Sequence, residues 1–159
     1  MKIKVGIGYD IHRLVHGRKL IFGGVAIDHD KGLDGHSDGD VLLHAISDAI
    51  FGGLGLNDIG HWFPDNDDAI KNIDSKEILK FAKQCLIDAN GQISNIDATI
   101  IAQEPYLAKY INDIKYEISR ILDIPMSDIG IKAKTNEKIG EIGRGEAIAV
   151  IATCCLIIH

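Results

Sequence analysis

The N-terminal segment of the chain alternates between apolar and other residues, which is the period of a β-strand. Within 2–12, KIKVGIGYDIH, the apolar side consists of Val5, Ile7, Tyr9 and Ile11. The other side carries Asp10, His12 and two glycines. Because glycine has no side chain, we expect this side to leave room for another group to approach the strand.

Further strands follow the same reasoning. A short hairpin is expected over 19–28, with its turn at Gly23–Gly24, and longer strands are expected over 96–103, 129–135 and 145–158.

Other segments carry apolar residues at the spacing of a helix. These are a segment that follows Ser37, the segment 74–91 and the segment 105–124. Ser37 is expected to cap the first helix and Gly52–Gly53 to end it. Gly91 is expected to end the second helix, and Pro105 to lie in the first turn of the third.

The order of these elements defines a fold class. Strands interleaved with helices predict an α+β two-layer sandwich, in which helices cover one face of a small mixed β-sheet. No linker or repeat interrupts the pattern, so we expect a single domain over 1–159.

Composition excludes several classes of function. The net charge is −6 and no basic cluster is present, which argues against a nucleic-acid partner. No apolar run is long enough to span a bilayer, and no signal peptide is recognisable, so we expect a cytoplasmic protein without a membrane partner. The three cysteines form no CxxC pair and are expected to be small apolar residues in a reducing compartment.

Three side chains suggest a metal site. Asp10 and His12 lie two residues apart on one side of a strand, and His44 lies one turn into the first helix, outside its apolar stripe. Two imidazoles and one carboxylate are the ligand set of a zinc ion that keeps a position open for water or substrate. The alternative is an ordinary Asp10–His12 pair and a solvent-bonded His44.

Polar residues elsewhere also allow two interpretations. His36 and Ser37 precede the first helix, where they either cap it or bind an anion. Asp58 is either a turn residue or an acceptor for substrate hydroxyls. Glu137 lies in a glycine-rich segment without the GK[ST] of a P-loop, and its carboxylate is a possible ligand for Mg²⁺.

Assembled in order, these segments resemble the 2-C-methyl-D-erythritol 2,4-cyclodiphosphate synthase family of the non-mevalonate isoprenoid pathway. The most specific motif is SDGDVLLHAI at 37–46; the others are GYDIHRL, DIGHWFPD, TIIAQEP, TNEKIG and GRGEAIA. The resemblance implies a homotrimer with active sites between neighbouring subunits. It also implies the reaction: 4-diphosphocytidyl-2-C-methyl-D-erythritol 2-phosphate is cyclised to the 2,4-cyclodiphosphate, and CMP is released.

The resemblance also assigns residues. It implies zinc on Asp10, His12 and His44, Mg²⁺ or Mn²⁺ on Glu137, and transition-state stabilisation by His36 and Thr135. The substrate-binding positions that it implies are Ser37, Asp58, Ile59, Gly60, Phe63, Asp65, Asp67, Ala102, Pro105, Tyr106, Leu107, Lys134 and Arg144.

Three positions depart from the family pattern. Many members have lysine at the position of Tyr106 and threonine at that of Lys134. Both positions belong to the cytidine pocket that the resemblance implies, so this chain has its lysine on the opposite side of that pocket. We hypothesise that it meets the same phosphate from the other side. Glu141 stands where an aromatic residue is common, near the expected threefold axis at Arg144, which argues against isoprenoid binding there.

Two other classes of function remain open: a zinc-dependent phosphoesterase, and a non-catalytic trimer that binds metal or an isoprenoid.

Overall fold

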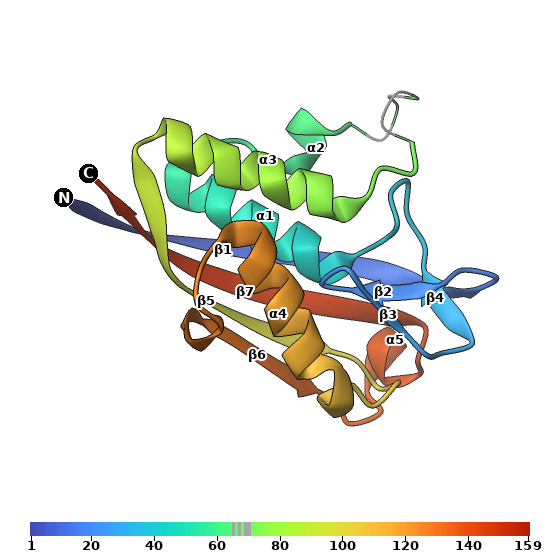
Figure 1. The fold of residues 1–159 in the computed structure, drawn as a ribbon. Helices are drawn as coiled ribbons and strands as arrows, with labels where there is room; N and C mark the ends of the chain where they lie inside the picture. The colour runs from blue at the N-terminus through green and yellow to red at the C-terminus, as the bar shows by residue number, and fades with distance from the viewer. Residues whose placement is uncertain (65, 67, 69–70) are drawn as a thin grey trace.

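The structure is a computed structural model that describes residues 1–64, 66, 68 and 71–159. In this part of the chain five strands form one sheet, in the order β4-β1-β7-β5-β6 (Figure 1). The strands are β1 (Lys2–His16), β4 (Lys31–Leu33), β7 (Ala147–Ile158), β5 (Gly91–Ile101) and β6 (Ile129–Lys134). Only the β5–β6 pair is parallel, so the described sheet is mixed, as predicted. The expected hairpin is formed by β2 (Leu20–Phe22) and β3 (Val25–Ile27).

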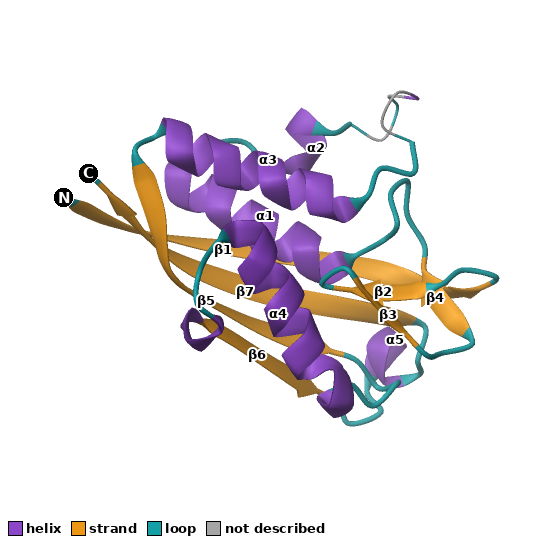
Figure 2. Cartoon of the chain, viewed as in Figure 1, coloured by secondary structure: helices purple, strands orange, loops and turns teal. Residues whose placement is uncertain are grey.

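The long helices lie on one face of this sheet, which confirms the two-layer α+β arrangement (Figures 1 and 2). They are α1 (Val41–Leu54), α3 (Ser75–Asp88) and α4 (Ile111–Leu122). The shorter helices are α2 (Ile59–Trp62), α5 (Gly140–Gly143) and the 3-10 turns η2 (Ala108–Tyr110) and η3 (Met126–Asp128). Within the described residues, none of the helices combines the length and the apolar character needed to cross a bilayer.

The glycine side of β1 faces the helices, and its apolar side faces away from them. A side chain at Gly6 would lie 1.8 Å from the carbonyl oxygen of Ala49, and one at Gly8 would lie 1.9 Å from that of Ala45. Helix α1 therefore fills the space that the glycines leave. By contrast, Val5 and Ile7 on the opposite side are 72% and 68% exposed.

The ends of the helices differ from the sequence prediction. Helix α1 is capped by Asp40, not by Ser37: the Asp40 Oδ1 accepts the N–H of Leu43 at 3.1 Å. The helix also runs through Gly52–Gly53 and ends at Gly55, whose φ of 77° is left-handed. Glycine lowers helix propensity, but packing against β1 and β7 outweighs that cost here.

The second helix begins where the sequence predicts but ends earlier, and the third helix begins later than predicted. Helix α3 is capped by Asp74, and the left-handed residue after it is Asn90, so that Gly91 already belongs to β5. Pro105 lies before η2 and outside α4, so the prediction of a proline in the first turn of the helix was wrong. Proline fixes its own φ and lacks a backbone N–H donor. Both properties are compatible with the irregular segment between β5 and η2 as well as with the first turn of a helix.

Candidate metal centre and substrate pocket

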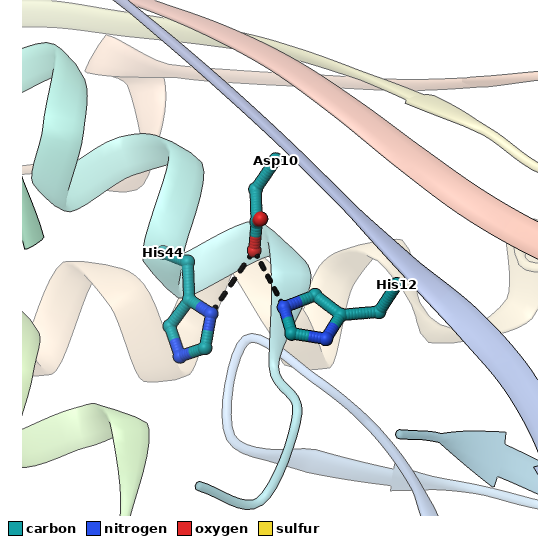
Figure 3. Close-up of side chains that lie close together, drawn as sticks. All are labelled: Asp10, His12 and His44. Carbon is teal, nitrogen blue, oxygen red and sulfur yellow. Dashed lines mark hydrogen bonds and ion pairs between the residues drawn. The ribbon is translucent and has the colours of Figure 1, made fainter. Parts of the chain in front are cut away.

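The close approach of α1 to β1 brings the three predicted ligands together. Asp10 and His12 project from β1 towards α1, and His44 projects back from α1 (Figure 3). The Asp10 Oδ2 lies 2.9 Å from the His12 Nε2 and 3.0 Å from the His44 Nδ1. Without side chains at Gly6 and Gly8, β1 and α1 can lie this close together.

The donor set of these three residues fits a zinc ion. One carboxylate oxygen and two imidazole nitrogens lie within 4.8 Å of one another, and among the described residues no other group of His, Cys, Asp or Glu was found in such an arrangement. Each ring also has a partner for its second nitrogen, which is the usual arrangement around metal-binding histidines. The His12 Nδ1 contacts the carbonyl of Asp34, and the His44 Nε2 contacts Ser75.

The charges of the cluster are coupled. Burial alone raises the pKa of Asp10, but the hydrogen bonds and charges of His12 and His44 outweigh it and hold this pKa well below its usual range. Burial lowers the pKa of His12, but the Asp10 carboxylate and the Asp34 carbonyl raise it by more. The cluster therefore keeps an ionised carboxylate ready for a cation, with a proton on His12 as its competitor.

A pocket of about 330 Å³ opens beside the cluster. The segments 58–60 and 36–37 and the end of α2 form its walls. The sequence-predicted residues that line it are Asp10, His12, His36, Ser37, His44, Asp58, Ile59, Gly60 and Phe63. His36 is exposed, whereas the side chain of Ser37 is buried and its Oγ accepts the N–H of Gly39. Asp65 and Asp67 lie outside the described residues.

Sequence reasoning missed Asp48, which also lines the pocket. Its Oδ1 accepts the N–H of Ile59 at 2.8 Å and thereby ties the Asp58–Gly60 segment to α1. Burial raises the pKa of this carboxyl. Asp48 follows His44 by four residues, so the helical period places both on one face, and this spacing could have revealed it.

The remaining predicted residues form a second group at the ends of β5 and β6. The N–H of Ala102 donates to the carbonyl of Lys134 at 2.9 Å, which joins the two segments. The Thr135 hydroxyl donates to a Glu137 oxygen at 3.0 Å. Other members of the group are Pro105, the 81% exposed Tyr106, the buried Leu107 and Arg144.

This second group does not line the first pocket. Three strand steps separate β1 from β6, a distance of roughly 14 Å at the usual strand spacing. Arg144 is engaged by the carboxylates of Glu146 at 2.8 Å and Glu141 at 3.6 Å. A single chain therefore separates the residues predicted for one active site into two groups.

Comparison with known proteins identifies the family. The model of the YgbB family matches residues 3–157. The chain belongs to the YgbB family. A relative from Clostridium acetobutylicum named 2-C-methyl-D-erythritol 2,4-cyclodiphosphate synthase is 52% identical over 155 residues, which cover 98% of this chain and all of that one. A relative of the same name from Alkaliphilus metalliredigens is 53% identical over 94% of both chains.

Several solved structures have the same fold as this chain. A Plasmodium falciparum protein named IspF, in complex with CDP, is 38% identical with a TM-score of 0.86, over 98% of this chain and 96% of that one. A 2C-methyl-D-erythritol-2,4-cyclodiphosphate synthase in a CDP-bound form is 29% identical with a TM-score of 0.89, over 97% and 100%. The bifunctional IspDF of Campylobacter jejuni is 40% identical with a TM-score of 0.95, but this chain spans only 43% of it.

Proposed function

We propose that this chain cyclises 4-diphosphocytidyl-2-C-methyl-D-erythritol 2-phosphate to 2-C-methyl-D-erythritol 2,4-cyclodiphosphate and releases CMP. The observation that carries the proposal is the convergence of Asp10, His12 and His44 in one pocket. The chain that holds this cluster matches relatives bearing the synthase name over nearly its full length. We place the reaction in the cytoplasm, where free thiols such as those of this chain remain reduced.

The reaction is an intramolecular phosphoryl transfer. An oxygen of the 2-phosphate forms a bond to the β-phosphorus, the bond from that phosphorus to the bridging oxygen breaks, and the electron pair leaves with CMP. Because the attacking phosphate is already an anion near pH 7, no strong general base is needed. Positioning and charge stabilisation therefore supply most of the catalysis.

Different residues of the chain would bind the metal ions, bind the substrate and stabilise the transferring phosphate. Asp10, His12 and His44 would hold zinc, and Glu137 would hold Mg²⁺ or Mn²⁺ beside the diphosphate. When bound, these ions supply positive charge to the phosphate oxygens as Lewis acids. Asp58–Gly60 and Phe63 contact the methylerythritol, and we assign the same role to Asp65 and Asp67, which lie outside the described residues. His36 and Thr135 stabilise the transferring phosphate, and Ser37 binds the substrate beside them.

A neighbouring copy of the chain completes the site in this proposal. The second group, from Ala102 to Leu107 and from Lys134 to Glu137, binds cytidine and the diphosphate across the subunit boundary. Two observations support a homotrimer: one chain keeps the two groups apart, and the outer face of β1 exposes a row of apolar side chains. Each trimer would then hold three sites, with Arg144 near its axis.

The decisive experiment is phosphorus NMR of the protein with this substrate, Zn²⁺ and Mg²⁺, repeated with His44→Ala. Equal amounts of CMP and the cyclic diphosphate, absent with the variant, would support the proposal. A linear phosphate product would favour a zinc-dependent phosphoesterase instead. An intact substrate with metal or an isoprenoid bound would favour a binding protein. The full-length match to relatives named as synthases speaks against both alternatives.

Lys134 provides a prediction within the cytidine pocket. It is exposed at the end of β6, across from the segment that carries Tyr106. If it contacts the substrate diphosphate, Lys134→Thr should raise KM by about 10- to 150-fold, since a charge-assisted hydrogen bond contributes roughly 1.5–3 kcal/mol. An unchanged KM in steady-state assays would contradict this role. Lys132→Thr is the matched control, because Lys132 lies on β6 like Lys134 but pairs with Asp97 of β5.

A further inference from the structure

The ring of His44 has a second polar side, turned away from Asp10. Its Nε2 lies 2.9 Å from the Ser75 Oγ and 3.2 Å from the Ser37 Oγ. Ser75 is the first residue of α3 and is 0% exposed. Neither the sequence pattern nor the resemblance assigned it any role.

The hydroxyl of Ser75 is itself held by a carboxylate. Its Oγ forms a very short hydrogen bond to the Asp38 Oδ1, and the backbone N–H of Ser75 donates to the Asp38 Oδ2 at 3.1 Å. The Oδ1 also accepts the N–H of Asp40 at 3.1 Å. An ionised carboxylate only accepts, so these contacts orient the Ser75 hydroxyl hydrogen towards Asp38.

That orientation fixes the role of the His44 nitrogens. With its hydrogen directed at Asp38, the Ser75 oxygen presents a lone pair to the Nε2, which must therefore donate. The Nδ1 lies 3.0 Å from the ionised Asp10, so a proton on this nitrogen must leave when a metal binds. The neutral ring then keeps its one N–H on the Nε2, and the Nδ1 presents its lone pair to the ion. The Nδ1 is the nitrogen 3.0 Å from Asp10, within the cluster of candidate ligands.

Ser37 does not serve this purpose equally well. It is farther from the Nε2, and its Oγ accepts the N–H of Gly39 at 3.1 Å. Its other neighbour is the Ser75 Oγ at 3.4 Å, and among the described residues no carboxylate orients its hydrogen. Asp38 and Ser75 come from the loop before α1 and from the start of α3, so the chain joins two distant segments behind one ligand.

We propose that Asp38 and Ser75 form a relay that positions His44, holding its ring as the Nε2–H tautomer with the Nδ1 free for the metal. The inference rests on the proposed metal-dependent function and assigns Ser75 and Asp38 as positioning residues. Carboxylates that reach a metal-bound histidine in this way typically affect metal affinity 10–100-fold.

The test measures zinc affinity by competition with a chromogenic chelator. Ser75→Ala should weaken zinc binding by about 10–100-fold. The matched control is Ser47→Ala, because Ser47 is equally buried, and its hydroxyl donates to the carbonyl of Leu43 without touching His44. Both variants lose one buried hydroxyl, so their thermal stabilities should fall by similar amounts, whereas only Ser75→Ala should lose zinc affinity.

A double-mutant cycle separates a relay from two independent contacts. Asp38→Asn should weaken zinc binding like Ser75→Ala, and the double variant should lose little more than either single one. Additive losses, or a Ser75→Ala affinity within twofold of the unmodified protein, would overturn the relay. In the latter case cyclisation by the unmodified protein would still stand, so the two proposals can fail separately.

The tautomer can also be read without any substitution. Nitrogen-15 NMR of the zinc-loaded protein, with His44 assigned, should place the proton on the Nε2 with a scalar coupling network typical of that tautomer. A proton on the Nδ1, or a chain that binds no zinc at all, would refute the relay even if Ser75→Ala failed to fold.

Discussion

At the scale of single residues, two carboxylates near the start of α1 have opposite environments. Asp10 is stabilised in its ionised form by His12 and His44, whose hydrogen bonds lower its pKa. Asp40 is 0% exposed, and burial raises its pKa to about 6 although it accepts three backbone N–H groups. The first carboxylate is available to a cation, whereas the second joins α1 to the turn of the β2–β3 hairpin.

The capping role of Asp40 predicts a loss of stability on substitution. Its oxygens accept the N–H groups of Gly23, Gly24 and Leu43 at 3.0, 2.7 and 3.1 Å. In Asp40→Asn the amide nitrogen must face at least one of these donors, which leaves it unsatisfied. The free energy of unfolding should fall by about 1–3 kcal/mol in urea titrations. Asp113→Asn, at an exposed position in the first turn of α4, should change it by less than about 0.5 kcal/mol.

The raised pKa of His12 predicts how metal binding depends on pH. Zinc needs the neutral ring, so a proton must leave His12 before the ion can bind. Because the pKa of His12 is raised above its usual range, zinc affinity should begin to decline at a higher pH than it would for an ordinary histidine, by up to about tenfold per pH unit for each proton displaced. Chelator competition between pH 8 and pH 6 measures this slope.

The control for this slope is His16→Ala, since the side chain of His16 is 75% exposed and lies outside the cluster. Its slope should match that of the unmodified protein. An affinity that stays constant between pH 8 and pH 6 would contradict the protonation of His12.

At the scale of elements, the sequence was sufficient for the long strands and helices but not for their ends. It did not indicate the short elements β4, α2 and α5, whose segments read as loops. Alternation located β1, and the helical period located α1, because both patterns depend on local geometry alone. The cap of α1 could not be read in the same way: Ser37 and Asp40 are both good capping residues, and the choice depends on Gly23 and Gly24, which come from a distant hairpin.

The same limit applies to the candidate site. The sequence suggested a metal site at Asp10, His12 and His44. However, no sequence spacing shows that two residues on a strand lie close to a residue on a helix. Their proximity depends on how tightly α1 packs on β1, which is a tertiary effect. Ser75 carried no signal at all, because a serine at the start of a helix is common for reasons of propensity.

Gly6 on β1 and Gly52 on α1 have different surroundings, so substitution by alanine should change the stability of the fold in opposite directions at the two positions. Gly6→Ala would bring a methyl group within 1.8 Å of the Ala49 carbonyl and must push α1 away from β1. Gly52 lies on the exposed side of α1, where a methyl group would meet nothing closer than 3.6 Å. Thermal unfolding should show that Gly6→Ala destabilises the fold strongly, whereas Gly52→Ala raises the free energy of unfolding by up to about 1 kcal/mol.

Zinc affinity provides a second readout for this pair. Displacement of α1 separates His44 from Asp10, so a folded Gly6→Ala protein should also bind zinc more weakly. Gly52→Ala should bind it normally. Equal stabilities of the two variants would mean that β1 and α1 adjust to each other more freely than their spacing indicates.

At the scale of the whole molecule, the two faces of the sheet differ in character. One face is covered by α1, α3 and α4. The other exposes apolar side chains along β1, with one more on β7: Ile3, Val5, Ile7, Tyr9, Ile11 and Ile151. Strand alternation alone does not reveal which side of β1 is covered within the chain. The glycine side is covered because α1 packs closely there, and the apolar side is left for a partner of similar character.

The proposed homotrimer gives this face a testable role. Ile7 is 68% exposed, so Ile7→Glu should leave the fold of the single chain intact while placing a charge in the proposed interface. Sedimentation should give three times the 17.3 kDa chain mass for the unmodified protein and a single chain for the variant. Ile87→Glu, on the outer side of α3 at 52% exposure, is the control that should remain trimeric.

The two groups of site residues make the functional consequence specific. The candidate metal ligands Asp10, His12 and His44 come from one chain, so the monomeric Ile7→Glu variant should bind zinc with nearly normal affinity. It should nevertheless lose cyclisation, because Thr135 and Glu137 would act on the pocket of a neighbouring chain. A monomer that still forms the cyclic product would show that one chain carries a whole active site, and loss of zinc binding in the monomer would show that the metal centre itself depends on assembly.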